Sequence, residues 1–237
     1  LATITDERFK QLKSILLKGI NPVSSDNLEL AENLSYKILV RWNDPISEKD
    51  RFGFNNDFTC FIPLTEDGND GILWVNHEST DRLFVSNYKR GDERTIEQVH
   101  KEMYSVGGSI IRIKKVNNDW EMVANDPLNR RITAQTEISL NWDTPIKGKT
   151  TVIGTHSNCS GGITPWGTIL SCEENYDDYY GQTEYDEGNN PSHKDSYIGW
   201  EKFYEYPPEH YGWVVEIDPL TGNCMKHIAL GRFMHEC

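Results

Sequence analysis

Apolar and polar positions follow a helical spacing at the start of the chain and a strand-like pattern after it. Residues 5–19 (TDERFKQLKSILLKG) carry apolar side chains at helical intervals, with Thr5 suited to cap the start and Gly19 suited to end it. The strands predicted from the β-rich runs that follow are 36–42, 57–64, 72–77, 108–116, 151–155, 168–173, 212–217 and 226–230. The pattern predicts a mainly β, antiparallel fold of the sandwich, barrel or propeller kind, with one N-terminal α-helix.

Two polar stretches interrupt the predicted strands. Residues 80–106 are charged and include a predicted short helix at 93–103. Residues 173–211 are rich in Tyr, Asp, Glu, Asn and Pro, and are too long for an ordinary connection between strands. This second stretch is therefore predicted to be either functional or mobile. Neither stretch has the composition of a linker between two cores, so we expect a single domain over residues 1–237.

Composition supports a folded core and narrows the range of partners. The 237 residues include 7 Trp, 11 Tyr and 8 Phe, which is enough aromatic surface for a core. The formal net charge of -13 disfavours nucleic acid and anionic membranes as partners, because the field of the protein repels both. No run approaches the ~20 apolar residues of a membrane span. The acidity is explained by solubility alone, or by carboxylates that bind hard cations such as calcium.

The 5 cysteines are an odd number and lack the CxxC spacing of zinc ribbons and thioredoxin-like proteins. At least one thiol is therefore unpaired within the chain, and one or two disulfides stay open as alternatives. The cysteines are Cys60, Cys159, Cys172, Cys224 and Cys237.

Acidic side chains stand where apolar runs end. Glu78 follows the run 72–77, and Glu236 closes the segment RFMHE in the same pattern. Since side chains alternate on a strand, Glu173 and Glu174 point to one place only if the strand has ended there. Each of these residues is also explained as a solvated strand end. Together with a thiol they form a ligand set suited to mixed hard and soft metals.

Two further polar segments lie beside predicted strands. The segment 53–57 (GFNND) is interpreted as an Asx-type turn that precedes a strand. In Asn129-Arg130-Arg131 the neighbouring arginines alternate faces, so at most one points into a given cleft. A guanidinium in a cleft matches a phosphate group with two hydrogen bonds, although a surface salt bridge is the commoner explanation of such a pair.

The segment 158–168 (NCSGGITPWGT) places Cys159 near a pair of glycines, which let the backbone approach a ligand closely. Cys159 is predicted to lie at the apex of a loop. A thiolate there is a soft ligand for a transition metal, or a nucleophile. His156 is close in sequence and makes a Cys–His hydrolase a rival hypothesis, while a buried, inert cysteine is the remaining alternative.

A series of segments resembles, in the same order, the blocks of the PhoX-type bacterial alkaline phosphatases. The segments are FGFNNDF, LWVNHE, GGSIIRI, NRRITA, NCSGGITPWGTILSCEEN, YGWVVEIDP and ALGRFMHE. The resemblance runs from about Trp42 to the end of the sequence, and NCSGG with TPWGT and CEEN is its most specific part. It implies a β-propeller that hydrolyses phosphomonoesters with iron (Fe³⁺) and calcium (Ca²⁺) ions linked by an oxo group. It also implies export by the twin-arginine route, to the periplasm or outside the cell.

The resemblance also implies roles for particular residues. Cys159 corresponds to an iron ligand and Glu236 to a metal-bridging carboxylate, with Glu174 and Glu78 as further carboxylates at or near the metals. Asn129 and Arg130 correspond to residues that hold the phosphate group of a small ester substrate. A dianionic substrate needs local positive charge in so acidic a protein, and metal ions with an arginine provide it.

Members of this family are considerably longer, and some of their metal and phosphate ligands lie in the second half. We therefore expect a propeller that lacks its C-terminal part, in a monomeric protein. The leading hypothesis is a metal-dependent phosphomonoesterase. The alternatives are a calcium-stabilised propeller that binds without turnover, and a Cys159/His156 hydrolase that thiol alkylation would inactivate.

Overall fold

The computed structural model describes residues 19–32 and 34–236. The chain divides into two compact units, Leu1–Ile38 and Leu39–Cys237. The described residues of the first unit form bends and turns without a helix or a strand. All but the last residue of the predicted helix 5–19 lies outside the described part of the chain. The second unit carries every strand described below.

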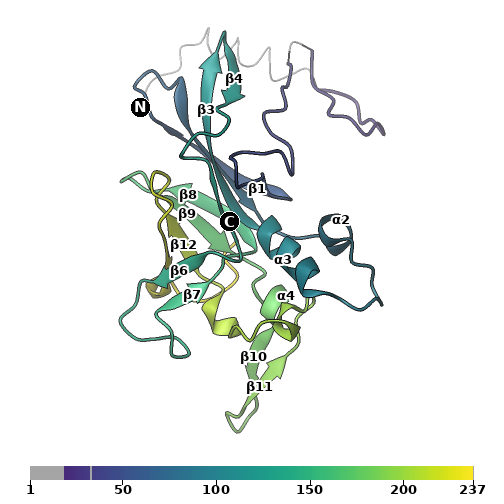
Figure 1. Ribbon diagram of the computed structural model, residues 1–237, viewed down its shortest axis with the longest axis vertical. Helices are drawn as coiled ribbons and strands as arrows, with labels where there is room; N and C mark the ends of the chain where they lie inside the picture. Colours follow the sequence, from purple (N-terminus) through teal and green to yellow (C-terminus); the bar gives the residue numbers. More distant parts are fainter. Residues whose placement is uncertain (1–18, 33, 237) are drawn as a thin grey trace. The chain divides into compact units, whose positions relative to one another are not determined.

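A five-stranded antiparallel sheet forms the first layer of the second unit (Figure 1). Its central strands β2 and β3 are buried on both faces for most of their length, because alternate side chains enter different cores. Ile110 joins the core shared with the second sheet, and its neighbour Ile111 joins a separate core on the other face. The strands are β1 (Asn56–Pro63), β2 (Asp70–His77), β3 (Gly107–Val116) and β4 (Asp119–Met122), in that order, with β5 (Arg130–Ile132) also pairing with β3.

A six-stranded sheet forms the second layer, and its apolar residues pack against those of the first. Ile138, Ile169 and Val215 share a core with Ile72 and Trp74 of β2. The only parallel pair in this sheet is β13 with β6. The strands, in spatial order, are β7 (Thr151–Ile153), β6 (Glu137–Leu140), β13 (Cys224–His227), β12 (Val214–Ile217), β9 (Ile169–Glu173) and β8 (Asn158–Ile163).

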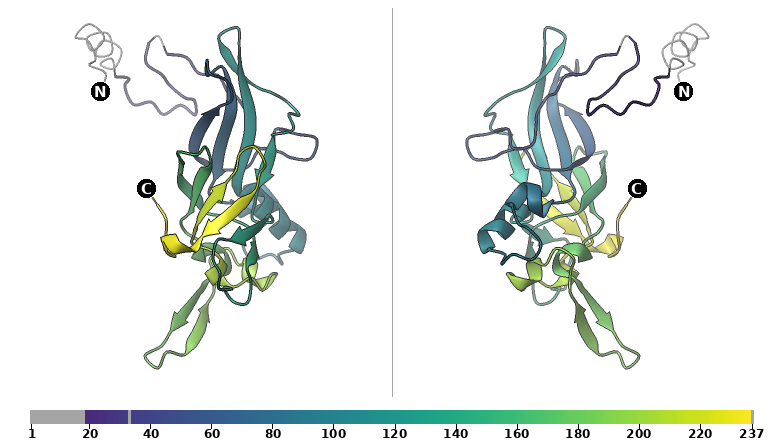
Figure 2. Two further views of the ribbon diagram at one scale, coloured as in Figure 1. Left: turned by 90° about the vertical axis from the view of Figure 1, so that its left-hand side faces the viewer. Right: turned by 90° about the vertical axis from the view of Figure 1, so that its right-hand side faces the viewer.

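Short helices and one hairpin make up the rest of the second unit. Helix α3 begins after Thr95, whose side chain forms a reciprocal capping box with Gln98. The hairpin β10–β11 extends away from the two sheets of the second unit (Figure 2). The remaining elements are α2 (Arg82–Ser86), α3 (Ile96–Ser105), α4 (Asp177–Tyr180), β10 (Gln182–Tyr185), β11 (Pro191–Lys194), η1 (Trp200–Lys202), η2 (Pro208–His210) and η3 (Ile228–Leu230).

The mainly β prediction is confirmed, and most predicted strands begin and end within two residues of β1, β2, β3, β7, β9 and β12. The predicted strand 36–42 is wrong, because this segment has no partner strand among the described residues. The run 226–230 is a strand only as far as His227 and continues as η3. Residues 173–211 contain α4, the hairpin, η1 and η2, and they supply aromatic side chains to a buried cluster.

Candidate metal centre

Acidic and thiol side chains from three strands converge at one end of the two sheets. Asp57 lies near the start of β1, Glu78 follows the last residue of β2, and Cys159 lies in β8. One carboxylate oxygen of Asp57, one of Glu78 and the Sγ of Cys159 all lie within 4.8 Å of one another. Cys159 is buried and Glu78 is partly buried, whereas Asp57 is exposed. This group offers both hard oxygen and soft sulfur donors to a cation.

Two further carboxylates lie close enough to act on this group electrostatically. Burial raises the pKa of Glu78, and the charges of Asp57, Glu174 and Glu236 raise it further. Burial likewise raises the pKa of Glu174, followed by the charge of Glu236. We call Asp57, Glu78, Cys159, Glu174 and Glu236 the candidate metal centre.

Backbone hydrogen bonds tie the segments of the candidate metal centre together. The amide of Glu78 donates to the carbonyl of Asn55 at 3.0 Å, which fixes the approach to β1 beside the end of β2. Ser157 N donates to Glu78 O at 3.1 Å, and Glu174 N donates to Ser157 O at 2.9 Å. Ser157 has a φ of 53°, an uncommon conformation for a residue other than glycine. The hydrogen bonds on either side of Ser157 therefore hold it in a strained conformation between Glu78 and Glu174.

Cys159 lies in a strand with a β-bulge, and the predicted loop apex is wrong. The pairing of β8 with β9 shifts register between Asn158 and Gly161. A Cβ on Gly161 would stand 2.5 Å from Leu170 O and 2.6 Å from the Phe58 ring. Only glycine fits at this position. The backbone at Gly161 therefore approaches Leu170 and Phe58 of this chain closely, and not a ligand.

Asn76 fixes the backbone of this bulge from the neighbouring sheet. Its Nδ2 donates to the carbonyls of Cys159 (2.8 Å) and Ser160 (3.1 Å). Its Oδ1 accepts hydrogen bonds from Trp74 Nε1 at 2.7 Å and Ser171 Oγ at 2.8 Å. Because Asn76 is fully buried, these bonds satisfy polar groups that water does not reach.

Glu173 and Glu174 point to different places, as the alternation of side chains predicts. β9 ends at Glu173, whose fully buried carboxylate accepts a hydrogen bond from Lys226 Nζ at 2.7 Å. It also accepts from the amides of Gly212 and Trp213 at 2.8 and 3.1 Å. The carbonyl of Glu173 accepts a hydrogen bond from His235 N at 3.2 Å. This bond fixes the position of His235, which directly precedes Glu236. Glu173 is therefore a structural anchor.

The candidate metal centre fits a cation. Burial, followed by the hydrogen bond and charge of Asp57, raises the pKa of the Cys159 thiol to about 12. The charged groups that raise the pKa values of Cys159, Glu78 and Glu174 are all carboxylates. A bound cation relieves this repulsion and favours the thiolate.

The structure brings together the predicted metal residues Cys159, Glu78, Glu174 and Glu236 and adds Asp57, which the sequence did not single out as a ligand. Asp57 belongs to the segment GFNND, which was interpreted as a turn. The segment does turn, and Asn55 has a left-handed φ of 51°. The available signal was that this carboxylate opens the β-rich run 57–64, whereas Glu78 follows the run 72–77.

Asn129 contacts the backbone instead of the candidate metal centre. Its Oδ1 accepts from Arg112 N at 2.7 Å, and its Nδ2 donates to Ile46 O and Val123 O, both at 2.8 Å. The side chain is buried in this network. Its predicted role in holding phosphate stays a prediction.

Arg130 and Arg131 point to opposite sides of β5, as predicted for neighbours on a strand. Arg130 donates to Leu128 O at 3.0 Å and to the carbonyl of Thr221, in the turn between β12 and β13. None of its hydrogen bonds described here reaches a residue of the candidate metal centre. The phosphate-binding role of Arg130 therefore also stays a prediction.

His156 does not provide a general base for Cys159. Its ring is fully buried, and neither ring nitrogen has a hydrogen-bond partner. The rings of Tyr179 and Tyr211 lie 4.3 and 4.4 Å from it between centroids. Burial, together with the charge of Lys226, lowers the pKa of His156 well below its usual value. The geometry therefore disfavours the Cys159/His156 hydrolase.

No disulfide joins the cysteines that the structure describes, which are Cys60, Cys159, Cys172 and Cys224. Cys237 lies outside the described residues. Within the described part of the chain, none of the helices has the length and apolar character needed to cross a membrane.

Comparison with known proteins shows the family of the chain. The family model described as alkaline phosphatase PhoX matches residues 16–237. The chain therefore belongs to the PhoX family of alkaline phosphatases.

A solved structure of Pseudomonas fluorescens PhoX, in complex with vanadate as a transition state analogue, is similar to this chain. The TM-score is 0.69 and the sequence identity is 27%. The match covers 84% of this chain and 41% of that protein, so this chain spans about two fifths of the length of its relative. A search of curated protein sequences gives no match.

Proposed function

We propose that this protein is a metal-dependent phosphomonoesterase that releases inorganic phosphate from small phosphate esters. The observation that carries the proposal is the convergence of Asp57, Glu78 and Cys159 within 4.8 Å, in a chain of the PhoX family. The vanadate complex of the P. fluorescens protein adds support, because vanadate is described there as a transition state analogue.

The residues of the candidate metal centre would hold iron and calcium. Cys159 would supply a thiolate ligand to Fe³⁺, and Glu78, Glu174, Glu236 and Asp57 are hard oxygen donors suited to Ca²⁺ and to Fe³⁺. When bound, these ions supply positive charge that neutralises phosphate oxygens in the transition state. The backbone hydrogen bonds of Ser157 would hold Glu78 and Glu174 in place, and the hydrogen bond from Asn76 to the carbonyl of Cys159 would hold the bulged strand β8.

Family membership also supports two proposals about the whole protein, a propeller architecture and a location in the periplasm or outside the cell. A monomeric state is a further proposal. The two sheets described above are compatible with propeller blades, since all pairs but one are antiparallel.

A second candidate function is a calcium-stabilised module that binds without turnover. It is favoured by the fact that the match covers only 41% of the P. fluorescens protein. In that case the candidate metal centre would bind cations and no phosphate would be released.

Hydrolysis of p-nitrophenyl phosphate at alkaline pH tests the proposal. We expect turnover by the wild-type chain that a chelator abolishes, that Glu78→Gln removes, and that Glu48→Gln leaves unchanged. Glu48 is an exposed glutamate outside the candidate metal centre and is the matched control. Metal binding without turnover would instead identify the binding module. Turnover that resists chelation and is lost on thiol alkylation would contradict both functions.

A further inference from the structure

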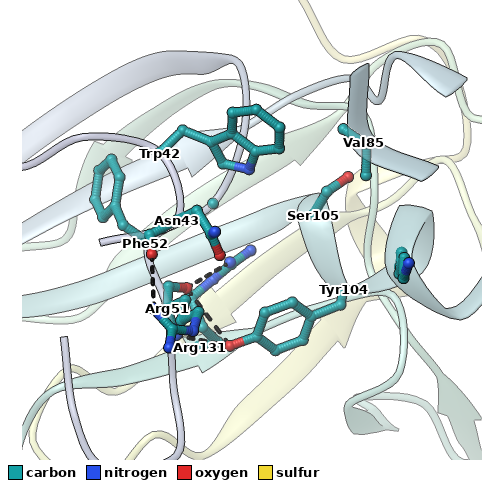
Figure 3. A pocket seen from close by; sticks show the side chains of 10 residues that line it. Trp42, Asn43, Arg51, Phe52, Val85, Tyr104, Ser105 and Arg131 are labelled. Carbon is teal, nitrogen blue, oxygen red and sulfur yellow. Dashed lines mark hydrogen bonds between the residues drawn. The ribbon is translucent and has the colours of Figure 1, made fainter. Parts of the chain in front are cut away.

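A cavity of 330 Å³ lies between α3, β5 and the segment that precedes β1 (Figure 3). The residues that define its chemistry are Trp42, Arg51, Lys101, Tyr104, Ser105 and Arg131. No residue of the candidate metal centre lines it. Its volume lies in the range of small-molecule sites.

The charge of the cavity is opposite to that of the protein. Its lining includes Arg51, Lys101 and Arg131 and contains no carboxylate, although the chain carries a net charge of -13. Among the described residues, neither Arg51 nor Lys101 forms an ion pair within 4.0 Å. Tyr104 of the lining donates a hydrogen bond from its Oη to Asp50 at 3.3 Å, and Asp50 itself does not line the cavity.

Arg131 gives the cavity a fixed, buried cation. It is 7% exposed, and its guanidinium donates to the carbonyls of Gly108, Arg51 and Val106 at 3.0, 3.1 and 2.9 Å. The Tyr104 ring lies 5.1 Å from its central carbon. Carbonyls hold this guanidinium in place without neutralising its charge. The charge of Asp50 acts on Arg131 and offsets part of its positive potential, and Arg51 and Lys101 add to that potential on the cavity side.

The opposite side of the cavity is aromatic. Figure 3 shows the Trp42 side chain across the cavity from Arg51, Arg131 and Tyr104. Trp42 is 44% exposed, and its ring packs edge-on against Phe54 at 5.0 Å between centroids. A flat group placed against this indole would have its charged end beside the cations.

We propose that this cavity is a binding site for a small planar organic anion. The anionic group binds Arg51 and Lys101 in the field of Arg131, and the planar group packs on Trp42. The site is separate from the proposed phosphatase chemistry, so it stands or fails independently of it.

Isothermal titration of the whole chain with phenylphosphonate tests the site, because its P–C bond is not a phosphate ester. We expect binding that Arg51→Gln and Lys101→Gln each weaken by about tenfold, since each removes a charge-assisted contact. Lys115→Gln removes an exposed lysine of β3 outside the cavity and should leave the affinity unchanged. Glu78→Gln should also leave it unchanged, which separates this site from the candidate metal centre.

The planar requirement has its own comparison. Trp42→Leu should weaken binding of phenylphosphonate and leave binding of methylphosphonate, which has no ring, unchanged. Absence of binding to the wild-type chain at about 10 mM phenylphosphonate would overturn the proposal. Binding that Glu78→Gln abolishes and that Arg51→Gln and Lys101→Gln leave intact would also overturn it.

Discussion

The candidate metal centre is built from a few side chains that lie in or directly after strands. Glu78 and Glu174 stand directly after β2 and β9, and both belong to the candidate metal centre. From the alternation of side chains along a strand, the sequence correctly predicts that Glu173 and Glu174 point to different places. The sequence does not identify Asp57 as a candidate ligand, because the segment GFNND is fully explained as a turn. The proximity of Asp57 to Cys159 joins residues about a hundred positions apart, which the sequence does not show.

Arg130→Gln separates a structural role from a phosphate-binding role. Its hydrogen bonds to carbonyls predict a loss of about 1–3 kcal/mol in the free energy of unfolding, with an unchanged KM for p-nitrophenyl phosphate. Urea denaturation and steady-state kinetics measure the two effects. A raised KM with unchanged stability would assign Arg130 to the substrate, as the family resemblance implies.

At the scale of elements, the sequence predicts where most strands lie, but it does not predict which strands pair with each other. The runs that became β1, β2, β3 and β9 carry enough apolar and β-branched residues to be recognised alone. The segment 36–42 has similar letters but no partner strand among the described residues, so it stays irregular. Cys159 was expected in a loop because its glycines suggested one, whereas pairing with β9 makes the segment a bulged strand.

Lys226→Met should destabilise the second sheet strongly. Lys226 and Glu173 are both fully buried, so the substitution leaves the Glu173 carboxylate without its cation. We expect a loss of about 3–5 kcal/mol in the free energy of unfolding, measured by chemical denaturation. The double variant Lys226→Met with Glu173→Gln should recover part of this loss. Equal losses in the single and double variants would contradict the account of Glu173 as an anchor.

Asp70 links β2 to β3 in a pH-dependent way. Its hydrogen bonds with Arg112, at 2.8 and 2.9 Å, lower the pKa of the Asp70 carboxyl in the folded state. The stabilisation is therefore complete above the unfolded pKa of about 3.9 and is lost as the pH falls through the lower folded pKa.

We expect Asp70→Asn to lower the free energy of unfolding by about 1–2 kcal/mol at pH 7, a modest value because Arg112 is 32% exposed. The difference from wild type should shrink below about pH 4. Thermal unfolding across this pH range measures it. A difference independent of pH would show that the charge of Asp70 is not responsible.

At the scale of the whole molecule, the candidate metal centre forms where the two sheets of the second unit meet at one end. Residues from β1, β2, β8 and the segment after β9 reach one place only because the sheets share a core. The sequence predicts a mainly β chain and singles out four of the five residues of the candidate metal centre. It does not show how one sheet packs on the other. The sequence likewise does not predict the cationic cavity beside α3, because Trp42, Lys101 and Arg131 are far apart along the chain.

The most direct test of the central claim is the iron and calcium content of the purified chain, measured by plasma mass spectrometry. We predict both metals in the wild-type chain, their loss from Asp57→Asn and Glu78→Gln, and their retention in Asp92→Asn, an exposed control. Equal metal content in all four proteins, or no metal in the wild-type chain, would contradict the assignment of Asp57, Glu78 and Cys159 as a metal centre.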